Sequence, residues 1–189
     1  MKNIICGMLA LVLVSMALGS AGCGRKAEAP AVDPRARQLV AEGTAYLKQG
    51  DVVKAVQSFA MSIKASPDNF DAYYMLGETF IRLKQFPQAQ AVLKGAVDRF
   101  PANPLAFYLL AVAYEGSDNM MPAIVAARKS LDIFQARGDE EGARRAMILL
   151  AALVQSAKKQ AETDMVNNAA EEAARASAKA PAAAPAAAE

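Results

Sequence analysis

Apolar residues in the middle of the chain recur at the spacing of amphipathic helices. Between residues 70 and 97 they form two stripes with three- and four-residue spacing. Lys84 and Gln85 separate the stripes, Pro87 can open the second helix, and Pro101 ends it. The pattern therefore predicts two helices joined by a short turn. The stripes consist of Ala72, Tyr73, Leu76, Phe80 and Leu83, and of Ala89, Val92, Leu93, Ala96 and Val97.

This helical pair repeats along the chain with a period of 34 residues. Small, aromatic and proline positions fall into register together, which unrelated segments rarely achieve. The sequence predicts three helical hairpins over residues 35–137. The aligned positions are Gly43, Gly77 and Ala111; Tyr46, Phe80 and Tyr114; Ala55, Ala89 and Ala123; Ile63, Val97 and Leu131; and Pro67 with Pro101.

Glycine occupies the middle of the first predicted helix in two of the units. Gly43 and Gly77 lie where glycine costs about 1 kcal/mol relative to alanine. Because glycine recurs at the same position of the repeat, we expect a close contact between helices there. Ala55 and Ala89 are expected to supply the facing side.

The pattern changes after residue 137. Gly138 breaks the chain, and an apolar stripe between Ala143 and Val154 predicts a helix over 138–160 that caps the last hairpin. Residues 161–189 form an Ala-rich, low-complexity tail that ends in PAAAPAAAE. We expect this tail to be mobile, with any helix ending by Lys179 and supported by a Glu171–Arg175 pair.

The N-terminus has the pattern of an export signal. One basic residue, Lys2, precedes an apolar run from Ile4 to Leu18, and small residues follow. The run is short for a membrane span, which needs roughly 20 residues, so an uncleaved anchor is the weaker reading. Residues 1–22 are therefore predicted to be a signal peptide. The polar, proline-containing segment that follows, up to residue 34, is predicted to be a flexible tether.

The residues Ala21, Gly22 and Cys23 resemble the lipobox of bacterial lipoproteins, although Ser20 stands where that family usually has Leu. The resemblance implies that Cys23 becomes the acylated N-terminus of the tether, residues 23–34. Gly24 stands where an Asp would retain such a lipoprotein in the inner membrane, which points to the outer membrane. Cleavage by the ordinary signal peptidase would instead release a soluble periplasmic protein.

Composition removes several classes of function. The chain has no His, and its net charge is only +2, with scattered basic residues. Nucleic acid is therefore an unlikely partner, because phosphate binding relies on clustered positive charge. No metal site, cofactor site or catalytic constellation is expected, since the common general base and metal ligand is absent and Cys23 would be the lone thiol.

The aligned positions resemble the tetratricopeptide repeat. That family has an aromatic or apolar residue at position 4, a small one at 8, an aromatic at 11, Ala at 20 and Pro at 32. Glu42 and Gln135 depart from the pattern in the first and third units. The resemblance implies an all-α, right-handed superhelix of about three hairpins with the C-terminal capping helix.

In that family the first helix of each repeat lines a concave groove. Carried over residue by residue, the groove would consist of Val40, Thr44 and Lys48, of Tyr74, Glu78 and Arg82, and of Tyr108, Val112 and Glu115. The family's clamp for a C-terminal carboxylate uses Lys and Asn at two of these positions, and this chain lacks both there. An apolar or amphipathic segment of a partner fits the tyrosines better. The tyrosines could instead pack between repeats or against the capping helix.

These patterns together predict a membrane-tethered scaffold that binds other proteins in the bacterial cell envelope and is not an enzyme. The favoured role is an assembly factor for an envelope, secretion or pilus complex, with an envelope protein or peptide as partner. The alternative is a regulatory binder of an envelope hydrolase or of a small ligand.

Overall fold

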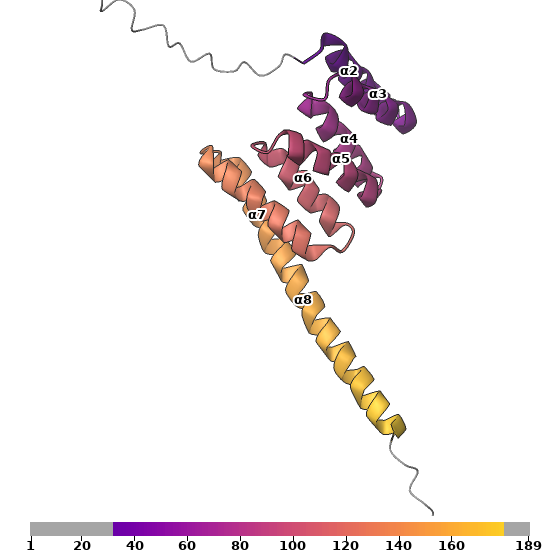
Figure 1. Ribbon diagram of the computed structural model, residues 1–189, viewed down its shortest axis with the longest axis vertical. Coiled ribbons are helices and arrows are strands. Elements are labelled where there is room, and N and C mark those ends of the chain that lie inside the picture. The colour runs from indigo at the N-terminus through magenta and orange to yellow at the C-terminus, as the bar shows by residue number, and fades with distance from the viewer. Residues whose placement is uncertain (1–31, 180–189) are drawn as a thin grey trace, which may run out of the picture. The chain divides into compact units, whose positions relative to one another are not determined.

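The computed structural model describes residues 32–179, with side chains through Arg175. The predicted signal peptide, Cys23 and the last ten residues lie outside the described residues. Within them the chain forms seven α-helices and no strand (Figure 1), so the all-α prediction is confirmed. The helices are α2 (Pro34–Lys48), α3 (Val52–Ala65), α4 (Phe70–Arg82), α5 (Phe86–Arg99), α6 (Pro104–Glu115), α7 (Met120–Ala136) and α8 (Glu140–Lys179).

The helices pair in chain order, and the pairs stack on one another. Helices α2 and α3, α4 and α5, and α6 and α7 form hairpins, while α7 also packs along α8. Helix α4 contacts its counterparts α2 and α6 in the neighbouring hairpins; within the described region α3, α5 and α7 make no comparable contacts with one another. The first helices of the hairpins therefore lie side by side, which is the arrangement that the candidate groove requires.

Polar side chains close the first turns of several helices. The side chain of Asp33 accepts a hydrogen bond from the Arg35 backbone N–H at 2.7 Å, and that of Asp51 accepts one from Lys54 at 3.1 Å. Asn103 caps α6 in the same way. These groups satisfy N–H donors that a helix leaves unpaired at its start, and so fix where each helix begins.

The turn inside each hairpin passes through the left-handed region at one repeat position. The residues at this position, 34 apart in the chain, are Gly50 with φ 80°, Lys84 with φ 56° and Asp118 with φ 57°. In the first turn the N–H of Asp51 bonds to the carbonyl of Tyr46, and the two later turns repeat this bond 34 residues on each time. All three hairpins therefore reverse with one turn geometry, although only the first uses glycine there.

The two helix glycines make the close contact that their repetition predicts, but with other residues than expected. A Cβ built on Gly43 would lie 2.6 Å from the Phe59 ring, and one on Gly77 would lie 2.7 Å from Leu93 Cδ2. Phe59 and Leu93 are almost wholly buried. The expectation that Ala55 and Ala89 fill this space was therefore wrong: a bulky side chain one helical turn further on fills it.

A buried hydroxyl joins the two helices of the first and third hairpins. Ser62 Oγ donates to the Ala36 carbonyl at 2.7 Å, and Ser130 Oγ donates to the Pro104 carbonyl at 2.9 Å. Each pair is 26 residues apart. In the first hairpin the Ser62 oxygen also accepts from Asn69 Nδ2 at 3.0 Å, which links that hairpin to the turn before α4.

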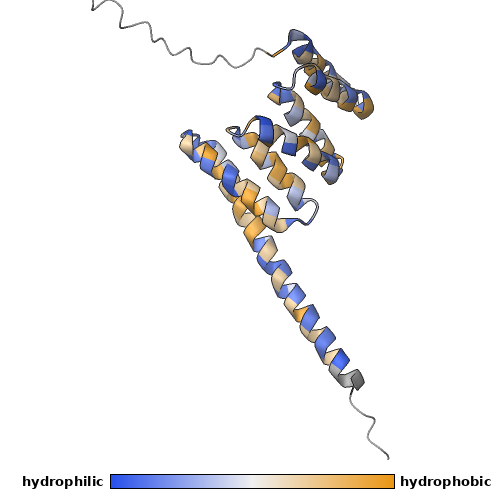
Figure 2. Cartoon of the chain, in the orientation of Figure 1, coloured by the Kyte–Doolittle hydropathy of each residue, from blue (hydrophilic) through white to orange (hydrophobic). Residues whose placement is uncertain are grey.

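Helix α8 continues past the boundary expected between cap and tail. Its first turns bury Ala146, Leu150 and Leu153 against the preceding hairpin, as a capping helix should. The chain then remains helical without a break at residue 160 as far as Lys179, and polar residues dominate this second half (Figure 2). Across residues 32–179 no helix has the length and apolarity that a bilayer crossing requires.

Candidate binding groove

Helices α2, α4 and α6, which we call the inner helices, carry the residues assigned to the groove. These residues differ in exposure. On α2, Val40 and Thr44 are half-buried and Lys48 is exposed. Thr44 Oγ1 donates to the Val40 carbonyl one turn earlier, at 2.8 Å. Its hydroxyl is thus occupied within its own helix, so α2 offers mainly methyl groups and one charge to a ligand.

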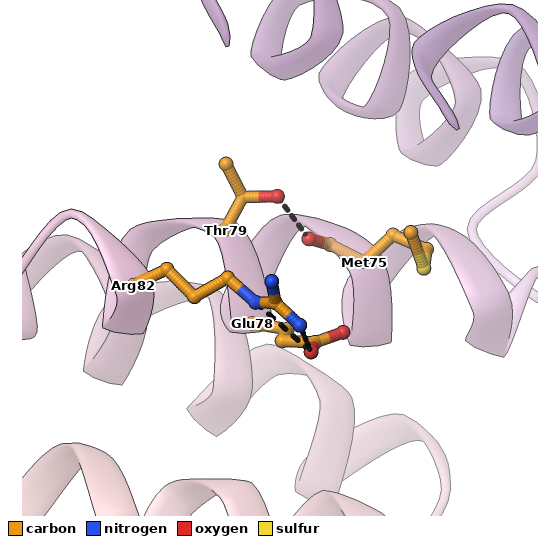
Figure 3. Close-up of polar contacts among 4 residues, drawn as sticks. All are labelled: Met75, Glu78, Thr79 and Arg82. Atoms are coloured by element: carbon orange, nitrogen blue, oxygen red, sulfur yellow. Dashed lines mark hydrogen bonds and ion pairs between the residues drawn. The ribbon is translucent and has the colours of Figure 1, made fainter. Parts of the chain in front are cut away.

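Helix α4 carries an ion pair along its surface (Figure 3). Arg82 donates from Nη2 to Glu78 Oε1 at 2.7 Å, and its Nε lies 3.2 Å from the same oxygen. The neighbouring Thr79 donates to the Met75 carbonyl at 2.6 Å. Because the Arg82 side chain is 77% exposed, the pair holds the two charges in place and adds little stability.

The ion pair borders a hollow between the first two hairpins. Leu47 and Val52 come from the first hairpin, and Met75, Glu78 and Arg82 from α4. The hollow has a volume of about 240 Å³. It therefore combines an apolar wall with one acidic and one basic group.

Tyr74 and Tyr108 meet at a second hollow of about 110 Å³, together with Leu105, Leu109, Phe134 and Arg145. We call this hollow the tyrosine socket. Both tyrosines are half-buried and pack against the core. A cavity of about 150 Å³ holds a benzene ring, so the socket has room for one aliphatic side chain and not for a helix.

The charges around the socket act on Tyr74. Burial raises the pKa of the Tyr74 hydroxyl, and the negative charge of Glu78 raises it further. Arg82 and Arg145 oppose these effects, while Tyr108 adds a small rise. Tyr74 therefore keeps its proton and remains a hydrogen-bond donor throughout the physiological pH range.

The structure thus brings some of the predicted groove residues together and leaves others apart. Tyr74 and Tyr108 share one hollow, and Glu78 and Arg82 share another. Val112 and Glu115 on α6 are half-buried but line neither hollow. Both readings of the tyrosines apply, because their rings pack on the core and, with Arg145 of α8, line a hollow.

Sequence reasoning missed a larger apolar hollow on another face of the third hairpin. Its volume is about 640 Å³. Met121 and Val125 are 67% and 66% exposed there, and Lys94 Nζ lies 5.6 Å from the ring centre of Tyr114, which also lines the hollow. The available signal was two apolar side chains four residues apart in the second helix of a hairpin. The lining residues are Phe107, Leu110, Tyr114, Met121, Pro122, Val125, Ala126 and Lys129.

The described residues offer half-buried surfaces for contact. Among residues 32–179 no group of three His, Cys, Asp or Glu side chains is placed to hold a metal ion. Every buried side-chain nitrogen or oxygen in this range has a hydrogen-bond partner. What remains to interact is half-buried aromatic and aliphatic surface with charges at its edge.

Comparison with known proteins agrees with this geometry. Residues 46–113 match the tetratricopeptide repeat family. A TPR repeat-containing protein from Picosynechococcus sp. is 28% identical over 87 residues, which cover 46% of this chain and 22% of that protein. The chain thus spans about a fifth of the length of this curated relative.

Two solved structures share the arrangement of the hairpins. The TPR2B domain of yeast Sti1, solved as a complex with pHsp70, has a TM-score of 0.61 and 21% identity over 66% of this chain and 99% of that one. The first TPR domain of Spaghetti (RPAP3), bound to the HSP90 peptide SRMEEVD, has a TM-score of 0.58 and 21% identity over 66% of this chain and 94% of that one. The described hairpins therefore have the superhelical fold of tetratricopeptide domains, and residues 46–113 match that family's repeat.

Proposed function

We propose that the chain is a membrane-tethered scaffold of the bacterial cell envelope that holds a segment of a partner protein against its inner helices. The observation that carries this proposal is the tyrosine socket beside the Glu78–Arg82 pair, on helices that lie side by side. The fold supports it, since the tetratricopeptide fold is in general a protein-interaction module and not a catalytic one.

The spacing along α4 favours an extended segment as the ligand. Tyr74, Glu78 and Arg82 follow one another at four-residue intervals, which in a helix separates them by about 6 Å per step. Alternate side chains of an extended strand are separated by nearly the same distance, about 6.5 Å. An apolar side chain in the socket would thus place the next side chain on the same edge of the segment near the ion pair.

The test compares partner binding by variants of the two tyrosines. Tyr74→Ala with Tyr108→Ala should enlarge the socket and remove the aromatic walls that an anchor side chain contacts. Loss of a buried anchor is worth about 2 kcal/mol, or roughly thirtyfold in affinity. The measurement is the amount of partner that co-purifies from solubilised envelopes, followed by a binding isotherm with that partner.

Tyr114→Ala is the matched control. Tyr114 is also a half-buried tyrosine of α6, but it lines the apolar hollow of about 640 Å³ on the third hairpin. Circular dichroism of each variant reports whether the fold is intact. If the double variant is folded and binds like the control, the partner does not use the socket and the proposal fails.

The membrane tether rests on the residues before the repeats. The short apolar run from Ile4 to Leu18, followed by Ala21, Gly22 and Cys23, supports export and acylation of Cys23. Several acyl chains bury enough CH₂ groups, at about 0.8 kcal/mol each, to hold the protein at a membrane permanently. Gly24 after the acylated residue supports placement in the outer membrane.

Cys23→Ser tests the tether separately from the groove. The variant should move from the membrane fraction to the soluble fraction and lose labelling by a fatty-acid analogue. A wild-type protein that is soluble and unlabelled would refute acylation and favour a soluble periplasmic protein.

Co-purification distinguishes the assembly role from the regulatory alternative. A scaffold for an envelope, secretion or pilus complex should co-purify with a membrane complex in fixed stoichiometry. Co-purification of a hydrolase whose activity changes on binding would instead favour the regulatory alternative.

A further inference from the structure

The second half of α8 is a long helix with exposed side chains. From Lys158 to Arg175 every side chain is exposed, including Met165 at 65% and Val166 at 69%. Isolated helices are marginally stable in water, and most helices in proteins are stabilised by packing an apolar face. A helix that continues this far beyond its own domain therefore has a surface available to a further partner.

An apolar stripe runs along this surface from the domain to the distal half. Met147 and Met165 are 18 residues apart, which is five turns, so they lie on the same side of α8. Ala151, Val154 and Ala161 fall within about 40° of the line between them. Met147 and Val154 are 52% and 47% exposed, although Leu150 and Leu153 on the adjacent face of the helix are buried. We call these five residues the α8 stripe.

The charge of α8 reverses between its two halves. Residues 140–160 contain four basic and two acidic side chains, a net charge of +2. Residues 161–175 contain one basic and four acidic side chains, a net charge of −3. Two such helices attract each other when they run in opposite directions and repel each other when they run in the same direction.

We propose that α8 is a self-association surface, on which a second copy of the chain lays its own α8 antiparallel along the α8 stripe. The opposite charges of the two halves select the second copy as the occupant and fix the direction of pairing. Because both copies use the same surface, the contact closes on itself as a twofold dimer and does not propagate.

One register combines the charges with the shape of the stripe. When Arg144 lies opposite Glu172 of the other copy, Met147 lies opposite Ala169 and Ala151 opposite Met165. Met147 and Met165 then each meet an alanine, as interdigitating helices require, while Val154 lies opposite Glu162. Lys158 is the one charged residue between Met147 and Met165 that falls within the same 40° band, and in this register it meets Lys158 of the second copy at the twofold axis. Glu162 on its own helix, at 3.9 Å, offsets its charge.

A hollow at the base of α8 lies in line with this register. It has a volume of about 530 Å³, and its lining includes Ala143, Arg144 and Met147 beside the turn at Gly138. The distal, acidic end of the second α8 would reach this hollow. The surface is separate from the tyrosine socket, so self-association and partner binding can be tested independently.

The first experiment measures the mass of the purified full-length chain in detergent by analytical ultracentrifugation across a concentration series. The wild type should be a dimer. Met165→Lys places a charge in the stripe and should raise the dimer dissociation constant at least tenfold. Asn167→Lys adds the same charge on the opposite side of the helix, where the side chain is also exposed, and should leave the dimer intact. A wild-type monomer at every concentration, or equal effects of the two variants, would overturn the proposal.

A charge exchange and a disulfide test the direction of pairing. Arg144→Glu and Glu172→Arg should each weaken the dimer, and the two together should restore it. In a chain with Cys6→Ser and Cys23→Ser, an Ala151→Cys copy mixed with a Met165→Cys copy should form a mixed disulfide. Disulfides that form only between identical copies would show parallel pairing and refute the antiparallel arrangement.

Discussion

Adding a single methyl group at Gly77 should destabilise the middle hairpin, although alanine is the better helix former. The built Cβ would lie 2.7 Å from Leu93 Cδ2 and 2.9 Å from Leu93 Cγ, closer than packed carbon atoms approach. Leu93 is 1% exposed, so its side chain cannot move out into solvent. Overpacking of this kind costs typically 1–3 kcal/mol, against a gain of about 1 kcal/mol in helix propensity. We expect a net loss of about 1 kcal/mol.

Gly95 provides the control within the same hairpin. It also lies in the interior of a helix, but its built Cβ would be 3.5 Å from the Tyr73 ring, an ordinary contact. Gly95→Ala should therefore stabilise the domain by about 1 kcal/mol through propensity alone. The two glycine variants should differ by about 2 kcal/mol, or roughly 4–8 °C in Tm for a domain of this size.

A double-mutant cycle then tests whether Leu93 is the cause. Leu93→Ala alone should cost about 2–5 kcal/mol, because it leaves a cavity in the core. In the double variant the new methyl group enters that cavity, so the two changes together should cost less than the sum of their separate costs. The assay is thermal and urea unfolding followed by circular dichroism. Additive effects, or a Gly77→Ala variant as stable as Gly95→Ala, would refute the packing argument.

Three further predictions follow from local contacts. Lys84→Gly should stabilise the domain by up to about 1 kcal/mol in urea unfolding, because Lys84 has a positive φ of 56° that glycine adopts without strain. Ser62→Ala should cost about 1–3 kcal/mol and more than Ser130→Ala, since it also leaves the buried amide of Asn69 without its partner. The pKa of Tyr74 is raised in the folded protein, so its contribution to stability is complete below the unfolded pKa of about 10 and is lost as the pH rises through the folded pKa. A spectrophotometric titration of the wild type, compared with Tyr74→Phe, should show one tyrosine that ionises at higher pH than in the unfolded chain.

The repeat pattern predicted the helices because the spacing of apolar residues reflects which face of a helix is buried. A buried face recurs in each hairpin. Ala72 and Leu76 point to the core in the structure as their spacing predicts, and so do the equivalent Ala106 and Leu110 of the third hairpin. The contacts between particular side chains were less accessible. Sequence reasoning paired each helix glycine with the nearest small residue, Ala55 or Ala89, whereas a large side chain one turn away fills the gap.

Other features depend on distance in space and not on periodicity. The hydroxyl bridge from Ser62 to Ala36 joins residues from opposite ends of a hairpin, and only the return of Ser130 at the same repeat position hinted at it. The size of the tyrosine socket depends on how Arg145 of α8 approaches Tyr74 and Tyr108, which no local pattern specifies. The boundary expected at residue 160 does not interrupt α8, which runs on to Lys179, because an Ala-rich segment can be helical without burying an apolar face.

The glycine contacts also bear on how such an array can change length. In the first two hairpins a residue without a side chain meets a large one, Phe59 or Leu93; in the third the two equivalent positions are Ala111 and Ala127, both buried. In each of these pairs, both residues belong to the same hairpin. A whole 34-residue unit can therefore be duplicated, deleted or transplanted with its internal fit preserved, whereas exchanging one helix alone would mismatch it. The hairpin, and not the helix, is the unit of recombination in this chain.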